Sequence, residues 1–312
     1  MKFKLDFNID ESEVKFDHSD EIILIGSCFS TEIANKLILN GFNAEVNPFG
    51  TLFHPSAILN VLKSSVSNDS NVFIKQSDDV FHSWDSAGGV YGMSEVELRE
   101  RVKEIRKSLK KSIESAKVLI ITFGTAWGYQ HNQLKCIVGN CHKENQNQFT
   151  KVLSTVSELE NDWVLLFNEM KSLNPELNVI FTVSPVRHKK DGLIENNRSK
   201  ARLIELVHRI VDKTTATYFP SYEILIDELR DYRFYSEDLV HPSQAAVDYV
   251  WSQFENSFCS HETKMLSQEV QRIKRSESHK TLYPNSKADK SMKEMVSKKK
   301  EQILLKYPFL NI

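Results

Sequence analysis

Hydrophobic residues gather in short uninterrupted runs along this chain. Three of these runs, at residues 22–25, 117–123 and 178–183, are rich in β-branched and aromatic side chains. A run of this length and composition predicts a strand that is buried on both faces, as in a parallel sheet. Two shorter segments, 42–46 and 216–219, bring the number of predicted strands to about five.

Amphipathic stretches lie between these runs, with apolar residues at helical spacing. The pattern predicts helices over residues 30–39, 54–62, 94–115, 149–174, 199–213, 221–229 and 243–257. Strands that alternate with helices in this way predict an α/β fold. In such a fold a parallel sheet is covered by helices on both faces.

Two segments interrupt the alternation. Residues 64–93 contain Ser and Asp clusters and the pair Gly88 and Gly89, and we expect an inserted loop or hairpin that can form one wall of a pocket. Residues 130–148 follow the second strong strand, and we expect an excursion close to the end of that strand.

The charge pattern changes after Cys259. Residues 260–312 contain 12 Lys and Arg against 6 Asp and Glu, although the whole chain has a formal net charge of −2. We therefore expect a domain at 1–258 and a basic helical extension at 259–312. A basic arm can bind nucleic acid, but a solvated helical face that packs on the domain or on a partner is the more common case. We expect no nucleic-acid partner.

The composition is that of an ordinary globular protein, with 40% hydrophobic and 26% charged residues. No apolar run approaches the roughly 20 residues of a membrane span, and the first ten residues lack the apolar core of a signal peptide. The four cysteines show neither a tight pairing nor a metal-ligand spacing. We therefore expect reduced thiols, a cytoplasmic protein and no bound metal. The oligomeric state stays open.

The first strong strand stops at Gly26, and Ser27 follows it at the start of a helix. In open α/β sheets ligands bind at the carboxyl ends of the strands, where a helix N-terminus also favours negative charge. Ser27 is therefore the first candidate nucleophile, although a serine there can also act only as the helix N-cap. Cys28 is the alternative nucleophile, but we expect a small buried thiol that packs as a hydrophobic residue.

The segment 236–243 supplies a candidate base late in the chain. It contains Asp238 and His241, three residues apart, so that one turn can hold the two side chains together. A serine hydroxyl is a poor nucleophile until a base takes its proton, and a carboxylate can orient the histidine that does so. Taken alone, the pair is also compatible with an ordinary surface turn.

Six short motifs occur along the chain, namely Gly26-Ser-Cys-Phe, Asn47-Pro-Phe-Gly-Thr, Phe123-Gly-Thr-Ala-Trp, Asn140-Cys-His, Ser184-Pro-Val-Arg-His and Asp238-Leu-Val-His-Pro. Together they resemble the motifs of the GSCFA family, a branch of the SGNH/GDSL-like hydrolase superfamily. They cover roughly residues 20–257, and the basic tail lies outside them. The resemblance implies a flavodoxin-like three-layer α/β/α sandwich. It also implies a triad of Ser27 as nucleophile, His241 as base and Asp238 as the residue that orients the base.

The resemblance further implies an oxyanion hole with three donors. In the superfamily these are the amide of the nucleophile, a Gly after the second strand and an Asn after the third. Ser27 and Gly50 match the first two positions by order. The third departs from the pattern, because Gly124 and Thr125 stand where Gly-x-Asn is usual. We expect Thr125, or Asn140 from the excursion, to take this role. Loss of one donor costs roughly 100- to 1000-fold in rate.

Four further residues are candidates for substrate binding. Arg187 and His188 follow the third strong strand. A guanidinium there can hold a carboxylate, a phosphate or a sugar acid, or it can form a structural ion pair. His54 either lines the pocket or only precedes the proline of a helix start. Trp127 either offers an aromatic floor to a sugar ring or belongs to the core.

These residues together predict a serine esterase or acyl transferase. We expect a small O-acyl ester of a carbohydrate-type alcohol as substrate and no metal or organic cofactor, and the substrate class rests on the resemblance alone. Two alternatives stay open. The first is a binding protein that keeps the fold without catalysis, and the second is a scaffold whose basic tail binds a partner.

Overall fold

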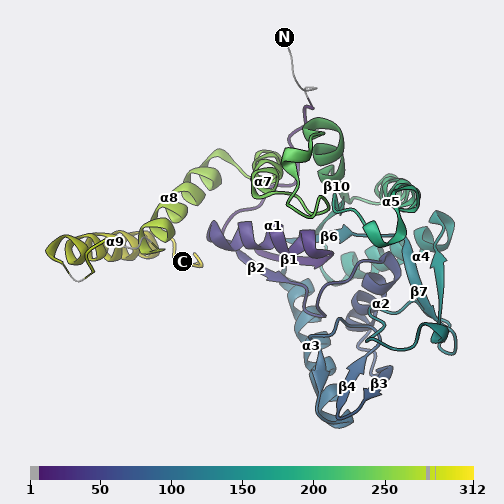
Figure 1. Cartoon of the computed structure of the whole chain (residues 1–312). Helices are drawn as coiled ribbons and strands as arrows, with labels where there is room; N and C mark the ends of the chain where they lie inside the picture. The colour runs from purple at the N-terminus through teal and green to yellow at the C-terminus, as the bar shows by residue number, and fades with distance from the viewer. Residues whose placement is uncertain (1–6, 279–281, 285) are drawn as a thin grey trace.

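A five-stranded sheet lies at the centre of the protein, for which the computed structural model describes residues 7–278, 282–284 and 286–312 (Figure 1). The strands stand in the order β10-β9-β6-β1-β2, and all neighbours are parallel. The predicted parallel sheet is therefore confirmed. The bounds are Glu21–Gly26 for β1, Asn43–Val46 for β2, Val118–Phe123 for β6, Asn178–Val183 for β9 and Thr217–Phe219 for β10.

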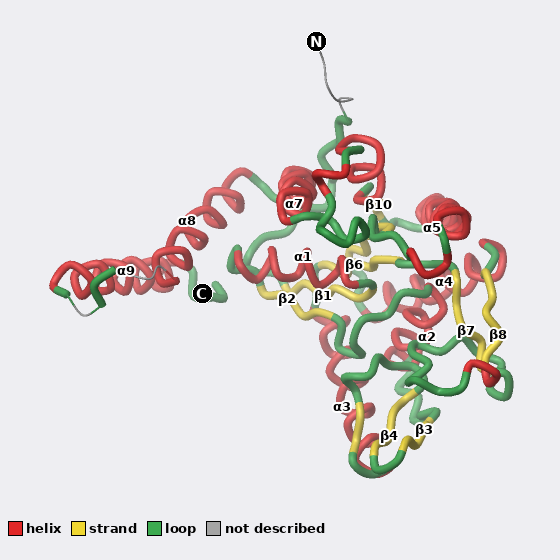
Figure 2. The backbone as a smooth tube through the Cα atoms, in the orientation of Figure 1, coloured by secondary structure: helices red, strands yellow, loops and turns green. Residues whose placement is uncertain are grey.

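Helices cover both faces of this sheet (Figure 2). One face is covered by α2 (Pro55–Val66), α3 (Glu95–Ser115), α4 (Val156–Leu173) and α5 (Leu193–Lys213). The other is covered by α1 (Cys28–Leu39), α7 (Gln244–Phe258) and the π-helical turn η3 (Ile224–Leu229), which follows the short α6 (Ser221–Glu223). The fold is thus the three-layer α/β/α sandwich that the sequence predicted.

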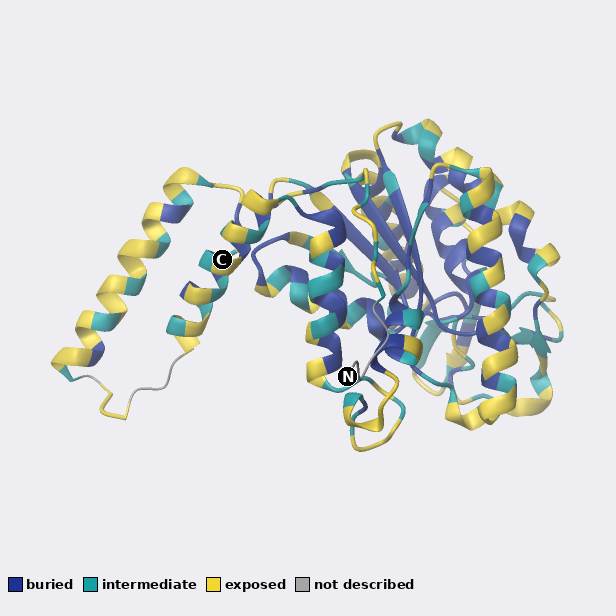
Figure 3. Ribbon diagram, turned by 90° about the horizontal axis from the view of Figure 1, so that it is seen from above, coloured by how far each residue is buried: buried dark blue, intermediate teal, exposed yellow. Residues whose placement is uncertain are grey.

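Strand β1 shows why the sequence folds in this way. Ile23 and Ile25 pack with the helices on one face, whereas Ile22 and Leu24 pack with the helices on the other. Successive side chains of a strand point to opposite faces, so a sheet covered on both sides requires an uninterrupted apolar run. Full burial of one such side chain stabilises the fold by about 1.5 to 3 kcal/mol. Figure 3 shows this buried centre between more exposed helices.

Small antiparallel sheets outside the main sheet accompany both interrupting segments, and the second segment mostly connects the two strands of its sheet. The first contains β3 (Ile74–Ser77), β4 (Val80–Ser83) and β5 (Tyr91–Gly92), and the predicted hairpin is therefore extended by one short strand. In the second, β7 (Trp127–His131) pairs with β8 (Phe149–Leu153).

Several helix boundaries differ from the sequence-based prediction, and two of them differ by more than five residues. The helix predicted over 149–174 is wrong at its start, because residues 149–153 form β8 and α4 begins only at Val156. Thr155 sets this boundary, since its side chain and that of Glu158 form a capping box. Helix α5 begins at Leu193 rather than at residue 199.

The chain beyond Cys259 forms two further helices, α8 (His261–Ser278) and α9 (Lys287–Lys306), which project from the body (Figure 1). This pair, which we call the arm, confirms the predicted helical extension. Its own small apolar cluster contains Val270, Ile273, Ile303 and Leu310. None of the described helices combines the length and the apolar character that a membrane crossing needs.

The arm is tied to the C-terminal end of α1. The Nζ of Lys274 donates to the carbonyl of Ile38 at 2.7 Å. The amide of Asn311 donates to the carbonyl of Gly41 at 3.2 Å. The arm therefore lies at the end of α1 that is opposite to Ser27.

Candidate active site

Gly26 closes β1 and determines where the candidate nucleophiles lie. Its φ is +145°, and a Cβ at this position would lie 2.2 Å from the carbonyl oxygen of Thr122 on β6. Glycine alone therefore fits this close approach of the two strands. Asn47 also fixes the backbone at Gly26, because its Oδ1 accepts a hydrogen bond from the Gly26 amide at 2.8 Å. The chain leaves the sheet here, at its carboxyl edge, and enters α1.

Ser27 is the N-cap of α1. Its backbone is extended, with φ −69° and ψ 175°, and its Oγ accepts a hydrogen bond from the Phe29 amide at 3.3 Å. Its own amide donates to the Thr122 carbonyl at 3.2 Å. The residue is only 1% exposed. The capping role that the sequence analysis left open is thus present in the structure.

Cys28 is the first residue of α1 and is half-buried. The thiol is thus half-buried, whereas a small buried residue was expected, and Cys28 is more accessible than Ser27. Burial raises the pKa of the Cys28 thiol, although the nearby amides and the charge of Lys200 act in the opposite direction. The thiol consequently stays protonated at neutral pH, and a base has to activate it before it can act as a nucleophile.

Asp238 and His241 lie side by side in the loop before α7. The Oδ2 of Asp238 is 2.6 Å from the Nδ1 of His241, and its Oδ1 accepts hydrogen bonds from the amides of Val240 and His241 at 2.9 and 3.0 Å. The hydrogen bond with the His241 ring is the main reason that the pKa of Asp238 lies well below its usual range. Both side chains are about half exposed, at 51% for His241 and 49% for Asp238. This arrangement orients the imidazole and leaves it accessible.

The loop that carries this pair is anchored to the segment that follows β9. The guanidinium of Arg187 lies over the ring of Tyr235, 4.8 Å from the ring centroid. Arg187 therefore makes a cation–π contact with Tyr235. The sequence analysis had considered a structural ion pair for this residue instead. Within the loop, the amide of Ser236 donates to the carbonyl of His241 at 2.8 Å.

His188 lies at the same edge of the sheet. Its ring meets that of Phe53 edge to face, with 5.5 Å between the centroids. Burial lowers the pKa of His188 to about 4, and the charges of Lys200 and His241 lower it further against an opposing effect of Asp191. His188 is therefore neutral at physiological pH and lies within electrostatic range of His241.

Lys200 of α5 is a central residue of this edge that the sequence analysis missed. It is 1% exposed, and its Nζ donates to the carbonyls of Gly124 and Ser184, each at 2.6 Å. Because these carbonyls follow β6 and β9, one side chain joins two strand ends. Burial lowers the pKa of Lys200 to about 7. Its position was the available signal, because Lys200 stands three residues before Leu203 and seven before Val207 on the apolar face of the helix.

The groups predicted to form the oxyanion hole have other partners. The amide of Gly50 donates to the carbonyl of Asn47 at 2.7 Å. The amide of Thr125 donates to the carbonyl of Phe53 at 3.1 Å, and its hydroxyl lies 3.0 Å from that of Ser199. With the Ser27 amide bonded to β6, the predicted backbone donors are all engaged within the protein. These residues build the turns at the sheet edge.

Asn140 is exposed. It stabilises its own turn, because its Oδ1 accepts a hydrogen bond from the His142 amide at 2.7 Å. The Nε2 of His142 lies 2.9 Å from the carbonyl oxygen of Ser83 and so links the excursion to β4. Among the described residues, no group of three or more His, Cys, Asp and Glu side chains is placed to hold a metal ion.

His54 and Trp127 also have structural partners. The Nδ1 of His54 accepts a hydrogen bond from the Ser56 amide at 3.0 Å, and its Nε2 lies 3.2 Å from the carbonyl oxygen of Ala126. Burial lowers the pKa of His54 to about 4, so the neutral ring joins α2 to the end of β6. The Nε1 of Trp127 donates to the carbonyl of Glu195 at 3.2 Å, while the residue remains half-buried.

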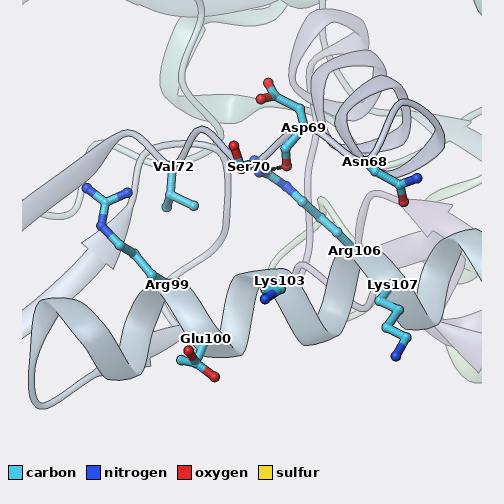
Figure 4. A pocket seen from close by; sticks show the side chains of 9 residues that line it. All are labelled: Asn68, Asp69, Ser70, Val72, Arg99, Glu100, Lys103, Arg106 and Lys107. Atoms are coloured by element: carbon cyan, nitrogen blue, oxygen red, sulfur yellow. Dashed lines mark hydrogen bonds between the residues drawn. The ribbon is translucent and has the colours of Figure 1, made fainter.

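A cavity of about 270 Å³ lies elsewhere, between α3 and the loop that precedes β3 (Figure 4). Arg106 spans it and donates to the carbonyls of Asp69 and Asn71, each at 2.7 Å. The cavity is separate from the sheet edge that carries Ser27 and His241. Its lining residues are Asn68, Asp69, Ser70, Val72, Arg99, Glu100, Lys103, Arg106 and Lys107.

The solved structures to which this chain is similar have low sequence identity to it. A family 3 carbohydrate esterase from Talaromyces cellulolyticus is 8% identical, with a TM-score of 0.36, and the match covers 81% of this chain and 99% of that one. A protein described as a GDSL-like lipase from Parabacteroides merdae is 13% identical, with a TM-score of 0.38 and coverage of 79% and 98%. A family 3 carbohydrate esterase from Clostridium thermocellum is 10% identical, with a TM-score of 0.31 and coverage of 80% and 98%.

Sequence comparison identifies the family directly. No curated protein sequence matches the chain. The model of the GSCFA family, in contrast, matches residues 21–254. This region contains the whole central sheet, the Ser27–Cys28 turn and the Asp238–His241 pair. The resemblance seen in the motifs is thereby confirmed, and the chain belongs to the GSCFA family.

Proposed function

We propose that this protein is an ester hydrolase or acyl transferase. His241, oriented by Asp238, acts as general base toward a nucleophile in the turn formed by Ser27 and Cys28. The observation that carries the proposal is the 2.6 Å contact between Asp238 Oδ2 and His241 Nδ1 in an accessible loop. A carboxylate on Nδ1 keeps the proton on that nitrogen, so that Nε2 can accept a proton from a nucleophile.

The reaction follows from these roles. The imidazole takes the proton of the nucleophile as the latter attacks the ester carbonyl. The imidazolium, stabilised by Asp238, then protonates the leaving alcohol. Water or a second alcohol releases the acyl group, with His241 again acting as base. This scheme requires neither a metal nor an organic cofactor.

The proposed substrate is a small acyl group, such as acetyl, on a carbohydrate-type alcohol. This assignment rests on the superfamily resemblance. The half-buried Trp127 and the side chains of Arg187 and His188 lie on segments that follow β6 and β9, so they are the residues to vary when alcohols are compared.

The test is hydrolysis of an aryl acetate and of acetylated sugars by the wild-type chain and by His241→Gln. We expect the variant to lose at least about 100-fold in kcat/KM, because the base is removed. His208→Gln on the exposed side of α5 is the matched control, and it should keep wild-type rates. Equal activity of the wild-type chain and His241→Gln would refute the proposal.

One observation favours a second candidate, a binding protein that uses the same fold without catalysis. The Ser27 hydroxyl is buried and the predicted oxyanion amides are bonded within the protein. In this case the wild-type chain would neither hydrolyse esters nor form a covalent adduct with an acylating probe. It would still show a rise in Tm with a bound carbohydrate ester.

A further inference from the structure

Two adjacent side chains at the sheet edge, those of Ser27 and Cys28, can act as a nucleophile. They differ in exposure and in hydrogen bonding. We infer that Cys28, and not Ser27, is the nucleophile of this site, so that the protein forms a thioester intermediate. This inference rests on the proposed function, because it assigns the nucleophile on which His241 acts. Two observations carry it, the buried capping position of Ser27 and the accessible position of Cys28 in the first turn of α1, and the charge of Lys200 supports it.

Ser27 is occupied by the turn that it forms. Its hydroxyl accepts the Phe29 amide at 3.3 Å, its amide donates to Thr122 at 3.2 Å, and it is 1% exposed. A hydroxyl that attacks a carbonyl must be reachable by the substrate, and the nucleophile's own amide is the nearest donor for the resulting oxyanion. Ser27 meets neither condition in this structure.

Cys28 meets both conditions. It is half-buried rather than buried, and it stands in the first turn of α1. In the part of the chain that the structure describes, no oxygen accepts a hydrogen bond from the Cys28 amide. That N–H lies against the thiol of the same residue, in a place where the helix dipole also favours negative charge.

Lys200 lies at the ends of β6 and β9 and supports the assignment. Its ammonium is held between the carbonyls of Gly124 and Ser184 at 2.6 Å from each. Its charge lowers the pKa of the Cys28 thiol, although burial has the larger and opposite effect. A cation near a thiol stabilises the thiolate once a base has taken the proton.

The chemistry of this site balances without a further reactant. His241 Nε2 takes the proton of the Cys28 thiol, and the sulfur forms a bond to the ester carbon while the carbonyl electron pair moves to oxygen. When the oxyanion collapses, the carbon–oxygen bond to the alcohol breaks and the imidazolium protonates the leaving alcohol. Water, deprotonated by His241, then attacks the thioester, and the thiolate leaves and regains a proton.

The first experiment needs no substrate. Native protein is treated with limiting iodoacetamide at pH 7.5, and the alkylation rate of each cysteine is followed by peptide mass spectrometry. Cys136 and Cys141 are also half-buried thiols, and burial raises their pKa as well, so they are internal controls. We expect Cys28 to react at least about 10-fold faster than either, and His241→Gln to abolish this difference. A Cys28 rate equal to the controls, or one unchanged in His241→Gln, overturns the inference.

The second experiment separates this inference from the proposed function. The wild-type chain is mixed with p-nitrophenyl acetate, quenched in acid and mapped for acetyl groups. Acetyl on Cys28 that neutral hydroxylamine removes supports the inference. Acetyl on Ser27 overturns it and leaves the esterase proposal intact. If no ester is turned over but alkylation of Cys28 is fast and depends on His241, the ester substrate is wrong and the assignment of Cys28 stands.

Variants of Cys28 complete the test. Cys28→Ala should lose at least about 1000-fold in kcat, whereas Cys136→Ala should keep wild-type turnover. Cys28→Ser keeps a hydroxyl at the same position and should retain measurable turnover and acquire a hydroxylamine-resistant acyl group. Circular dichroism and Tm of each variant establish that it is folded. Wild-type turnover by folded Cys28→Ala would overturn the inference.

Discussion

The carboxylate of Asp238 makes two hydrogen bonds with His241. Its Oδ2 lies 2.6 Å from the ring Nδ1, and its Oδ1 accepts a hydrogen bond from the backbone amide at 3.0 Å. Asp238→Asn keeps an oxygen for the amide but removes the charge that stabilises an imidazolium. We expect at least about a 100-fold loss of kcat in ester hydrolysis with little change in KM. Steady-state kinetics with an aryl acetate measure both quantities.

A matched control for this variant lies in the same loop. Asp231 also caps a turn, because its Oδ1 accepts the amide of Arg233 at 2.9 Å, but it does not contact a histidine ring. Asp231→Asn should therefore keep kcat within about 2-fold of wild type. Equal losses in the two variants would show that Asp238 acts only on the loop conformation.

The pKa of Lys200 makes a prediction about stability at alkaline pH. Its folded-state pKa of about 7 lies below the ordinary value of 10.5. Between these values the unfolded chain binds more protons than the folded chain, so the free energy of unfolding contributed by this group rises from about pH 7 to about pH 10. Lys200→Met removes this rise and leaves two carbonyls unpaired. Urea unfolding at pH 6.5 and 9.5 should show the wild type gaining stability relative to the variant at the higher pH.

The exposed Lys190 provides the comparison for this experiment. Lys190→Met should follow the wild-type pH dependence, because no buried amine is removed. If Lys200→Met also follows it, the Lys200 amine does not titrate in the range assigned to it.

Acid should destabilise the fold partly through His54. Its folded-state pKa of about 4 lies below the ordinary 6.5. The unfolded chain therefore binds more protons between these values, and stability falls as the pH drops from about 6.5 to 4. His54→Asn keeps an N-cap for α2 and removes the titrating ring. We expect a lower free energy of unfolding at pH 7.5, by about 1 kcal/mol for the lost hydrogen bond, and a weaker decline with acid. His208→Asn should retain the wild-type decline.

Much of the fold could be predicted because its determinants are local. In the run from Ile22 to Ile25, the side chains that point to either face of the sheet are all apolar. Such a run is required only where helices cover both faces of the sheet. Gly26 marks the end of the strand. The contact between Asp238 and His241 was predictable for the same reason, because three residues of separation place both side chains in one turn.

The parts that the sequence did not reveal depend on contacts between distant segments. The roles of Gly50 and Thr125 are decided by carbonyls of Asn47 and Phe53 that the turns bring close. Residues 149–153 continue an amphipathic pattern into α4, and only pairing with β7 makes them a strand. Lys200 falls on an apolar helix face, where its two carbonyl partners come from other strands.

Two buried serines test how unpaired hydroxyls affect stability. Among the described residues, the Oγ of Ser30 has no hydrogen-bond partner, whereas the Oγ of Ser65 donates to the carbonyl of Val61 at 2.7 Å. Both serines are 0% exposed. Ser30→Ala should leave the free energy of unfolding unchanged or raise it by up to about 1 kcal/mol, and Ser65→Ala should lower it by about 1 kcal/mol. Urea denaturation gives both values, and the reverse order would contradict the prediction.

We propose that residues 1–258 form the catalytic domain and that the arm is accessory. Deletion of residues 260–312 should keep ester turnover within about 3-fold of the full chain, because the proposed catalytic residues all precede this segment. Tm should fall, since the buried His18 loses its contact with Ser267 at 3.3 Å and Asn40 loses that with Gln271 at 2.6 Å. Complete loss of turnover by a folded truncated chain would place the arm within the catalytic unit.

The hydrogen bond from Asn311 to Gly41 joins the first helix of the sandwich to a segment near the far end of the sequence. During synthesis this bond can form only after almost all of the intervening chain has left the ribosome. The C-terminal turn of α1 therefore stays uncovered throughout translation of the domain. Only binding of α8 and the segment around Asn311 covers the turn, and a product that ends before α8 would expose it to proteases and chaperones.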